Sequence, residues 1–222
     1  MRGMSTRVFL VRHGATVLSA EDRFAGSLDA DLSDTGREQA RALGRRLAGE
    51  PIVAVYASPM SRTRETAELI VHGRGLTVKP VTALRETDHG HWEGRTRAEV
   101  QADDPGEYDR WQRDPFTFAP RGGETGLQVL ARALPAFLGL VAKYPETSVL
   151  VVSHKATIRL VIGHLLGVEP RGFRDRLDQS PCGLNVLDVQ PGGEARLILF
   201  NDVSHYATLP GPGGGRLSPW WA

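Results

Sequence analysis

Short apolar runs alternate with amphipathic stretches along most of the chain. The apolar runs predict strands at residues 7–11, 52–56, 76–81, 148–152, 184–189 and 195–200. Apolar residues at helical spacing predict helices between them, at residues 34–49, 59–71, 126–144 and 155–166. We expect Ser33 and Ser58 to cap the first two helices and Pro135 to kink the third. This alternation predicts an α/β fold, a three-layer α/β/α arrangement with a mostly parallel central sheet.

The pattern breaks between Arg85 and Gly123, where the chain is polar, aromatic and rich in Pro and Gly. We interpret residues 87–123 as a small helical insertion near the mouth of the site, within a catalytic domain of residues 1–209. Its aromatic residues either pack the insertion or cover an apolar part of a substrate; they include Trp92, Tyr108, Trp111 and Phe116. The Pro- and Gly-rich tail of residues 210–222 ends in Trp220-Trp221, which either docks on a partner subunit or stays disordered.

Composition and charge exclude several classes of protein. The chain of 222 residues has the length of one domain, and 41% hydrophobic and 24% charged residues are typical of a soluble globular protein. A formal net charge of +1 without a basic stripe argues against nucleic-acid binding. Because no stretch approaches the roughly 20 apolar residues of a membrane span and no signal-like segment opens the chain, we expect a cytoplasmic protein. The single cysteine, Cys182, excludes an intramolecular disulfide and a multi-cysteine zinc site.

Charged side chains follow four of the predicted strands at the point where each strand ends. Arg12 and His13 follow the first strand, and Arg62 lies in the first turn of the helix after the second. Glu86 follows the third strand, and His154 follows the long apolar strand directly before a helix. Because the carboxyl ends of parallel strands meet at one edge of a sheet, we expect these side chains to surround one crevice.

This set of residue types favours phosphoryl transfer. A neutral histidine can attack phosphorus, so His13 is the candidate nucleophile. Arg12 and Arg62 would hold the phosphoryl oxygens, and a protonated His154 at a helix N-terminus would add positive charge. Glu86 would protonate the leaving oxygen and then deprotonate the attacking water. Two alternatives stay open, namely an ion pair of Glu86 with Arg85 or Arg95, and a metal-binding rather than pocket-lining role for the pair His89 and His91.

The chain resembles the histidine phosphatase superfamily, also called the phosphoglycerate-mutase-like family. The resemblance covers residues 7 to about 206 and rests on Leu10-Val-Arg-His-Gly-Ala-Thr16, Leu32-Ser-Asp-Thr-Gly-Arg-Glu-Gln-Ala40, Ser58-Pro-Met-Ser-Arg62, Leu84-Arg-Glu86, Gly90-His-Trp-Glu-Gly94, Gly122-Gly-Glu-Thr125, Val152-Ser-His154 and Asn201-Asp-Val-Ser-His205. It implies that His13 is the phosphorylated nucleophile and Glu86 the proton donor. Arg12, Arg62 and His154 would complete the catalytic set, with no metal and no cofactor.

On the substrate side the resemblance implies a wider binding set, comprising Arg12, Thr16, Ser19, Arg23, Gly26, Arg62, His154 and Lys155. Three positions depart from the family pattern. Ala15 stands where glutamate is frequent, Ser19 where asparagine is frequent, and Lys155-Ala156 where a glycine pair is usual. Lys155 is either an extra cation for a second anionic group of the substrate or a solvated side chain in the first turn of a helix.

The function predicted from these residues is hydrolysis of a small phosphorylated metabolite through a phosphohistidine at His13. One alternative is a phosphoglycerate mutase that depends on 2,3-bisphosphoglycerate. The short insertion, which lacks the Arg-His-Tyr-Gly stretch of the mutases, favours hydrolysis. A second alternative is a non-catalytic protein that binds phosphorylated ligands. We expect neither nucleic acid nor membrane as a partner, and a homodimer is a further hypothesis.

Overall fold

The computed structural model of the protein describes residues 5–20 and 23–207, without the side chains of residues 19 and 20. The tail with Trp220-Trp221 lies outside these residues. Within them, six strands form one sheet in the order β3-β2-β4-β1-β5-β6. The strands are β1 (Thr6–Arg12), β2 (Ile52–Ala57), β3 (Val78–Pro80), β4 (Ser148–Ser153), β5 (Leu184–Val189) and β6 (Ala195–Asp202). β1, β2, β3 and β4 are parallel to one another, and β5 is antiparallel to β1 and β6.

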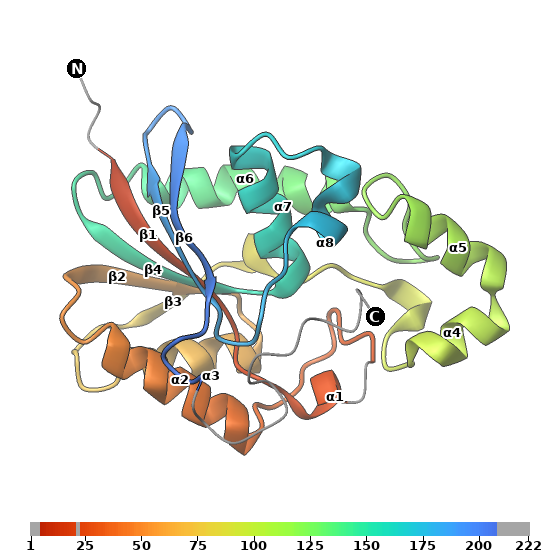
Figure 1. Ribbon diagram of the computed structural model, residues 1–222, viewed down its shortest axis with the longest axis horizontal. Coiled ribbons are helices and arrows are strands. Elements are labelled where there is room, and N and C mark those ends of the chain that lie inside the picture. The colour runs from red at the N-terminus through yellow and green to blue at the C-terminus, as the bar shows by residue number, and fades with distance from the viewer. Residues whose placement is uncertain (1–4, 21–22, 208–222) are drawn as a thin grey trace.

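Helices cover both faces of the sheet, because the central strands are apolar on both sides. In β1, Phe9 and Val11 join one core with helices α2 (Asp34–Arg46) and α3 (Ser61–Ile70). Val8 and Leu10 point to the other face and join a second core with α6 (Gly126–Val141) and α7 (Lys155–Leu165). Figure 1 shows these two helix pairs on opposite sides of the strands. The predicted three-layer α/β/α fold is confirmed.

Helix starts follow the capping rules in part. Ser33 accepts a hydrogen bond from the Gly36 amide (3.1 Å), as predicted, and Thr125 caps α6 in the same way. The predicted start of α3 is wrong, since the helix begins at Ser61 with Met60 as its N-cap residue. The carboxylate of Asp29, from a distant segment, accepts from the Ser61 amide at the start of this helix.

Two other elements differ from the pattern of apolar residues. The strand expected at residues 76–81 is limited to β3, an edge strand paired with three residues of β2. It ends at Pro80, a residue that an edge strand tolerates, and the next amide, of Val81, still donates to the carbonyl of Ala57 (2.8 Å). α6 continues as a helix through Pro135 and ends at Val141, before the predicted end at residue 144. Short segments complete the chain, namely α1 (Val17–Ala20), α8 (Phe173–Arg176), and the 3₁₀ turns η1 (Thr82–Leu84), η2 (Gly90–Trp92) and η3 (Pro170–Gly172).

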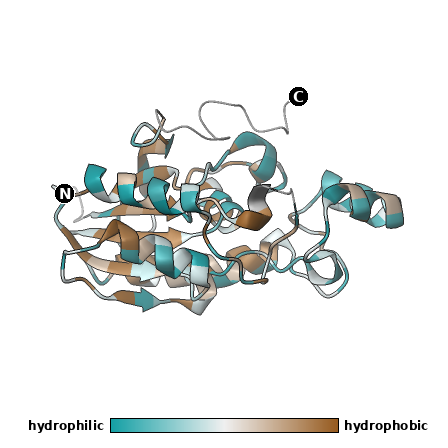
Figure 2. Ribbon diagram, turned by 90° about the horizontal axis from the view of Figure 1, so that it is seen from below, coloured by the Kyte–Doolittle hydropathy of each residue, from teal (hydrophilic) through white to brown (hydrophobic). Residues whose placement is uncertain are grey.

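The segment predicted as an insertion contains η2 and two helices, α4 (Arg97–Asp103) and α5 (Pro105–Arg113). Both views show it projecting from one end of the sheet, with polar and apolar positions mixed along its helices in Figure 2. It has its own apolar cluster, which buries Phe24, Trp92, Val100, Tyr108 and Trp111. Packing therefore accounts for Tyr108 and Trp111. In the part of the chain that the structure describes, no helix is long and apolar enough to cross a membrane.

Candidate active site

The register of the sheet places the carboxyl ends of β1, β2 and β4 side by side at one edge. Arg12 of β1 lies opposite Ser153 of β4, and Ala57 of β2 lies opposite Val152. The residues that follow these strand ends, His13, Ser58 and His154, are therefore neighbours. The rings of His13 and His154 lie 5.2 Å apart between centroids, and both side chains are buried.

His13 is held in a defined orientation and tautomer. Its Nδ1 lies 2.8 Å from the carbonyl oxygen of Gly14, and because a carbonyl only accepts, Nδ1 carries the hydrogen. In the neutral ring, Nε2 then has the free lone pair. The next residue, Gly14, passes so close to α2 that a Cβ would lie 2.6 Å from the carbonyl oxygen of Gly36. The geometry therefore offers Nε2 as the nucleophilic atom.

Both histidines of the pocket are neutral in the ligand-free protein. Burial first, and then the charges of Arg12 and Arg62, hold the pKa of His13 well below its usual value. Burial also places the pKa of His154 well below its usual value, with His13 and the two arginines adding to the effect. His154 is therefore neutral in the empty pocket, and its protonation beside a bound phosphate stays a prediction. Its Nε2 lies 2.8 Å from the hydroxyl of Ser58, which serves this histidine rather than capping α3.

Arg12 and Arg62 are anchored to backbone carbonyls and keep further donors. Arg12 Nη1 donates to the carbonyl of Gln179 (2.7 Å), while its buried Nε has no hydrogen-bond partner among the described residues. Arg62 donates from Nη1 to Leu28 (2.7 Å) and from Nη2 to Gly26 (2.9 Å). Each guanidinium has five N–H donors, so both arginines can still bind an anion.

The carboxylate of Glu86 lies at the N-terminus of α7. It accepts from the amide of Ala156 (3.1 Å) and from the amide and hydroxyl of Thr157 (3.2 Å each). Among the described residues Glu86 forms no ion pair with Arg85 or Arg95, and Arg95 pairs with Asp103 instead. The first amides of α7 thus hold the Glu86 carboxylate.

Arg132 of α6 fixes the backbone that carries Glu86. It donates to the carbonyl oxygens of Ala83 (2.7 Å), Arg85 (2.9 Å) and Glu86 (2.9 Å), and it pairs with Glu124 (2.8 Å). Sequence reasoning missed Arg132, Ser58 and Thr157. Only the Gly122-Gly-Glu-Thr125 motif, which contains Glu124, gave a signal for this network.

The substrate-side residues are placed, but not shown to bind a ligand. Thr16 is buried and bridged to Leu32. Arg23 donates to the carbonyl of Gly94 (2.9 Å). A Cβ on Gly26 would lie 2.0 Å from Glu93 Oε1, so this glycine is needed to shape the loop whose carbonyl anchors Arg62. The side chain of Ser19 lies outside the described residues.

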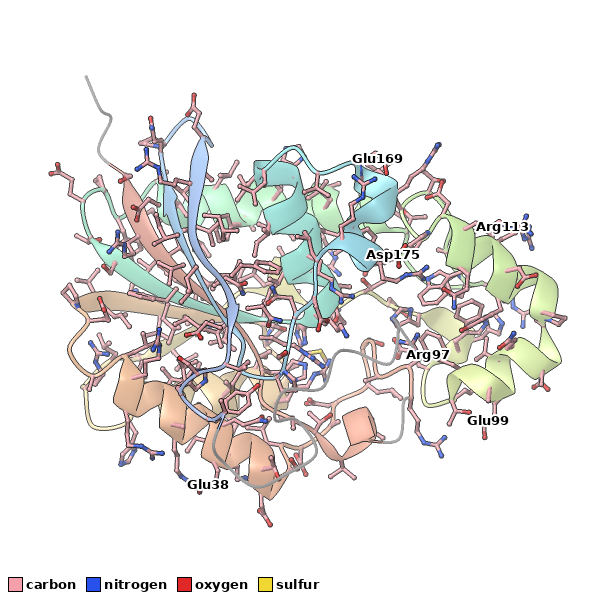
Figure 3. The ribbon with its side chains drawn as sticks, in the orientation of Figure 1. Glu38, Arg97, Glu99, Arg113, Glu169 and Asp175 are labelled. Carbon is pink, nitrogen blue, oxygen red and sulfur yellow. The ribbon has the colours of Figure 1, made fainter. Side chains whose placement is uncertain are left out.

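We call the part of the site formed by residues beyond the strand ends, including His89, His91, Arg97, Lys155 and Asp178, the outer wall. The sequence left two of its features open. His89 is partly buried beside Phe24 (4.9 Å between ring centroids), whereas His91 Nε2 lies 3.0 Å from Glu107, so these histidines do not share a centre. Lys155 is 27% exposed and lies 3.5 Å from Asp178, so its ammonium is paired and only partly exposed to solvent. In Figure 3, Arg97 lies on the side of α4 that faces the body, and Glu99 and Arg113 point outward.

Comparisons with known proteins place the chain in a family. The family model of the histidine phosphatase superfamily (branch 1) matches residues 8–203. Glucosyl-3-phosphoglycerate phosphatase of Mycobacterium tuberculosis is 39% identical over 140 residues, a match that covers 63% of this chain and 62% of that protein. Phosphoserine phosphatase 1 of Hydrogenobacter thermophilus is 35% identical over 168 residues, covering 75% of this chain and 79% of that protein.

Solved structures show the same fold. YhfR of Bacillus stearothermophilus superposes with a TM-score of 0.85 at 31% identity, covering 90% of this chain and 98% of that one. A mycobacterial glucosyl-3-phosphoglycerate phosphatase in complex with VO3 gives a TM-score of 0.79 at 31% identity, covering 88% and 98%. With its family model, its relatives and its fold in agreement, the chain belongs to the histidine phosphatase superfamily, branch 1.

Proposed function

We propose that the protein is a phosphomonoesterase that hydrolyses a small phosphorylated metabolite through a phosphohistidine at Nε2 of His13. The observation that carries the proposal is the neutral, oriented and buried His13, whose pKa is lowered by the nearby charges of Arg12 and Arg62. Its Nδ1 is committed to Gly14, and its low pKa leaves Nε2 unprotonated at neutral pH. A nucleophile of this kind reacts without first losing a proton.

In the first step, Nε2 of His13 attacks phosphorus and the ester P–O bond breaks. Glu86, protonated in the substrate complex, gives its proton to the leaving oxygen. Arg12 and Arg62 bind the phosphoryl oxygens, where their charge stabilises the transition state. The entering dianion offsets the positive charges around His154, so this histidine gains a proton more easily when substrate is bound.

In the second step, the Glu86 carboxylate takes a proton from water, whose oxygen attacks phosphorus. The P–N bond breaks, inorganic phosphate forms, and both residues return to their starting states. The hydrogen bonds from Ala156 and Thr157 hold the carboxylate in place for both transfers. His13 and His154 are buried next to each other, and Glu86 is partly buried at the start of α7; the presence of all three supports catalysis over simple ligand binding.

The names of the relatives support the substrate class. They are phosphatases of glucosyl-3-phosphoglycerate and of phosphoserine, which are small phosphorylated acids. The match spans less than two thirds of the mycobacterial phosphatase, so its substrate does not transfer directly. A cytoplasmic location and a homodimer stay predictions, as do the binding roles of Thr16, Ser19 and Arg23.

Hydrolysis of p-nitrophenyl phosphate tests this function, together with labelling of the protein by a ³²P-phosphomonoester. We expect turnover and an acid-labile, base-stable label in the wild type, and neither in His13→Ala. His72→Ala is the matched control because its side chain is exposed on a distant helix end. No turnover in the wild type, or equal turnover in His13→Ala, would contradict the proposal. Conversion of 3-phosphoglycerate to 2-phosphoglycerate only after priming with 2,3-bisphosphoglycerate would identify a mutase instead.

A further inference from the structure

A second group of cations lies beside the phosphate pocket. Lys155 and Arg159 stand one turn apart on α7 and reach the same oxygen of Asp178, at 3.5 Å and 2.8 Å. Asp178 follows α8, which contacts α7. The Arg159 side chain is only 6% exposed, while Lys155 and Asp178 are 27% and 38% exposed. Solvent and ligands can therefore reach the lysine and the carboxylate from one side.

The backbone next to Asp178 ties this group to Arg12. The carbonyl of Gln179 accepts from Arg12 Nη1 (2.7 Å), so adjacent residues contact the phosphate arginine and the second cationic group. The Gln179 side chain exchanges hydrogen bonds with Asn185, which donates to the carbonyl of Leu10 in β1 (2.9 Å). The second group is thus held at a fixed position relative to the strand that carries His13.

The phosphate arginines and the second cationic group differ in how much of their positive charge is neutralised. Arg12 and Arg62 supply two positive charges for the two negative charges of a phosphate monoester, and the exposed Asp29 lies 3.9 Å from Arg62. Lys155 and Arg159 face one carboxylate, Asp178, and so retain one positive charge. The buried Nε of Arg159 also has no hydrogen-bond partner in the described part of the chain. A buried surplus charge of this kind is stabilised by one further anionic group.

We propose that Lys155, supported by Arg159 and Asp178, forms a second-anion subsite that selects phosphomonoesters carrying a carboxylate. The inference rests on the proposed function for its phosphate site and adds the substrate class. A carboxylate near the phosphate ester contacts the Lys155 ammonium while Arg12 and Arg62 hold the phosphoryl group. Asp178 keeps the lysine in position when the subsite is empty.

The subsite has its own pH dependence. The charged groups that act on Lys155 are Arg12 from β1, Arg159 from α7 and Asp178 from the loop after α8. Burial first, and then the two arginines, lower the pKa of Lys155 to about 7. Above this pH the free protein carries an uncharged lysine, so the preference for a carboxylate decreases as pH rises through 7.

Two matched probes test the subsite, 3-phosphoglycerate and glycerol 3-phosphate, which differ by a carboxylate in place of a hydroxymethyl group. Their inhibition constants are measured as competitors of p-nitrophenyl phosphate hydrolysis. We expect the wild type to bind 3-phosphoglycerate about 10-fold more tightly at pH 6.5, the effect of one charged contact. Lys155→Met should reduce this preference to about 1, and Lys155→Arg should keep it without the decrease above pH 7. The exposed Lys143→Met is the matched control and should change nothing.

Equal preferences in the wild type and Lys155→Met, or a preference that does not change between pH 6 and 9 in the wild type, would overturn the subsite. Failure of the proposed function gives a different result, namely no hydrolysis of p-nitrophenyl phosphate and no label on His13. In that case calorimetric titration of the same two probes still measures the preference. The two proposals can therefore fail separately.

Discussion

The phosphate end of the site and its outer wall are built in different ways. At the phosphate end, His13, Arg62 and His154 directly follow strands or begin a helix, and they are 6%, 2% and 0% exposed. The outer wall is carried by elements beyond the sheet, with Arg97 on α4 and Asp178 on a loop, both partly exposed. The reacting groups thus lie at the rigid sheet edge, whereas the outer wall lies largely on segments that can vary without disturbing them.

Among the substitutions that distinguish the two regions, we expect Glu86→Gln to have the largest effect on activity. Glutamine keeps the size of the side chain but supplies no proton, so kcat for an alkyl phosphate should fall about 10³-fold. p-Nitrophenol is a good leaving group that needs no proton, and its ester should lose much less in the first step. Exposed Glu68→Gln is the control. Equal losses for the two esters would show that Glu86 does not protonate the leaving oxygen.

Much of the fold and of the phosphate end could be predicted from the sequence, because both depend on the succession of apolar and charged residues within short segments. The contiguous apolar residues at 8–11 in β1 and 149–152 in β4 define the centre of the sheet, and a residue after a strand end must lie at its edge. Ser58 shows the limit of this reasoning. A serine before a proline is typical of a helix cap, but its hydroxyl bonds His154, which lies 96 residues away.

The charge of His154 could not be predicted for the same reason. A histidine at a helix N-terminus is expected to attract anions, yet burial and the arginines near it, which come from other segments, lower its pKa. Arg132 is a further case, since its contacts to the carbonyls before Glu86 depend on how α6 packs. Local patterns identify the reacting groups, and long-range packing sets their protonation and support.

Arg62→Lys tests the arginine that links the two regions. Lysine cannot reach the carbonyls of both Gly26 and Leu28 while binding a phosphoryl oxygen, because it lacks the planar fork. We expect kcat/KM to fall about 100-fold for every phosphomonoester, irrespective of the rest of the substrate. Arg64→Lys, two residues later and exposed, should have almost no effect. A loss confined to carboxylate-bearing substrates would place Arg62 in the wall instead.

A smaller effect is expected for Arg132→Met, which removes the contacts that hold the Glu86 backbone. Arg132 is a positioning residue, so kcat for an alkyl phosphate should fall about 10-fold with little change in KM. In a Glu86→Gln background the same substitution should add almost nothing, since both changes act on one proton transfer. Arg41→Met, exposed on α2, is the control. Full additivity of the two losses would mean that Arg132 acts on the general stability of the site.

The smallest expected effect concerns His89, a partly buried histidine of the outer wall. It is a change in the free energy of unfolding rather than in activity. Burial lowers the pKa of His89 to about 4, below the value near 6.5 of an unfolded histidine. The unfolded chain therefore binds more protons, and His89 destabilises the fold as pH falls below about 6.5, until the loss levels off near pH 4. For one such group the loss is about 1 kcal/mol at pH 5.5. Phenylalanine can pack against Phe24 and does not titrate. His89→Phe should therefore make the free energy of unfolding less dependent on pH between 7.5 and 5.5, as measured by urea titration. The exposed His72→Phe is the control. An unchanged slope would mean that the acid sensitivity of the protein comes from the phosphate end, where His13 and His154 are also buried and neutral.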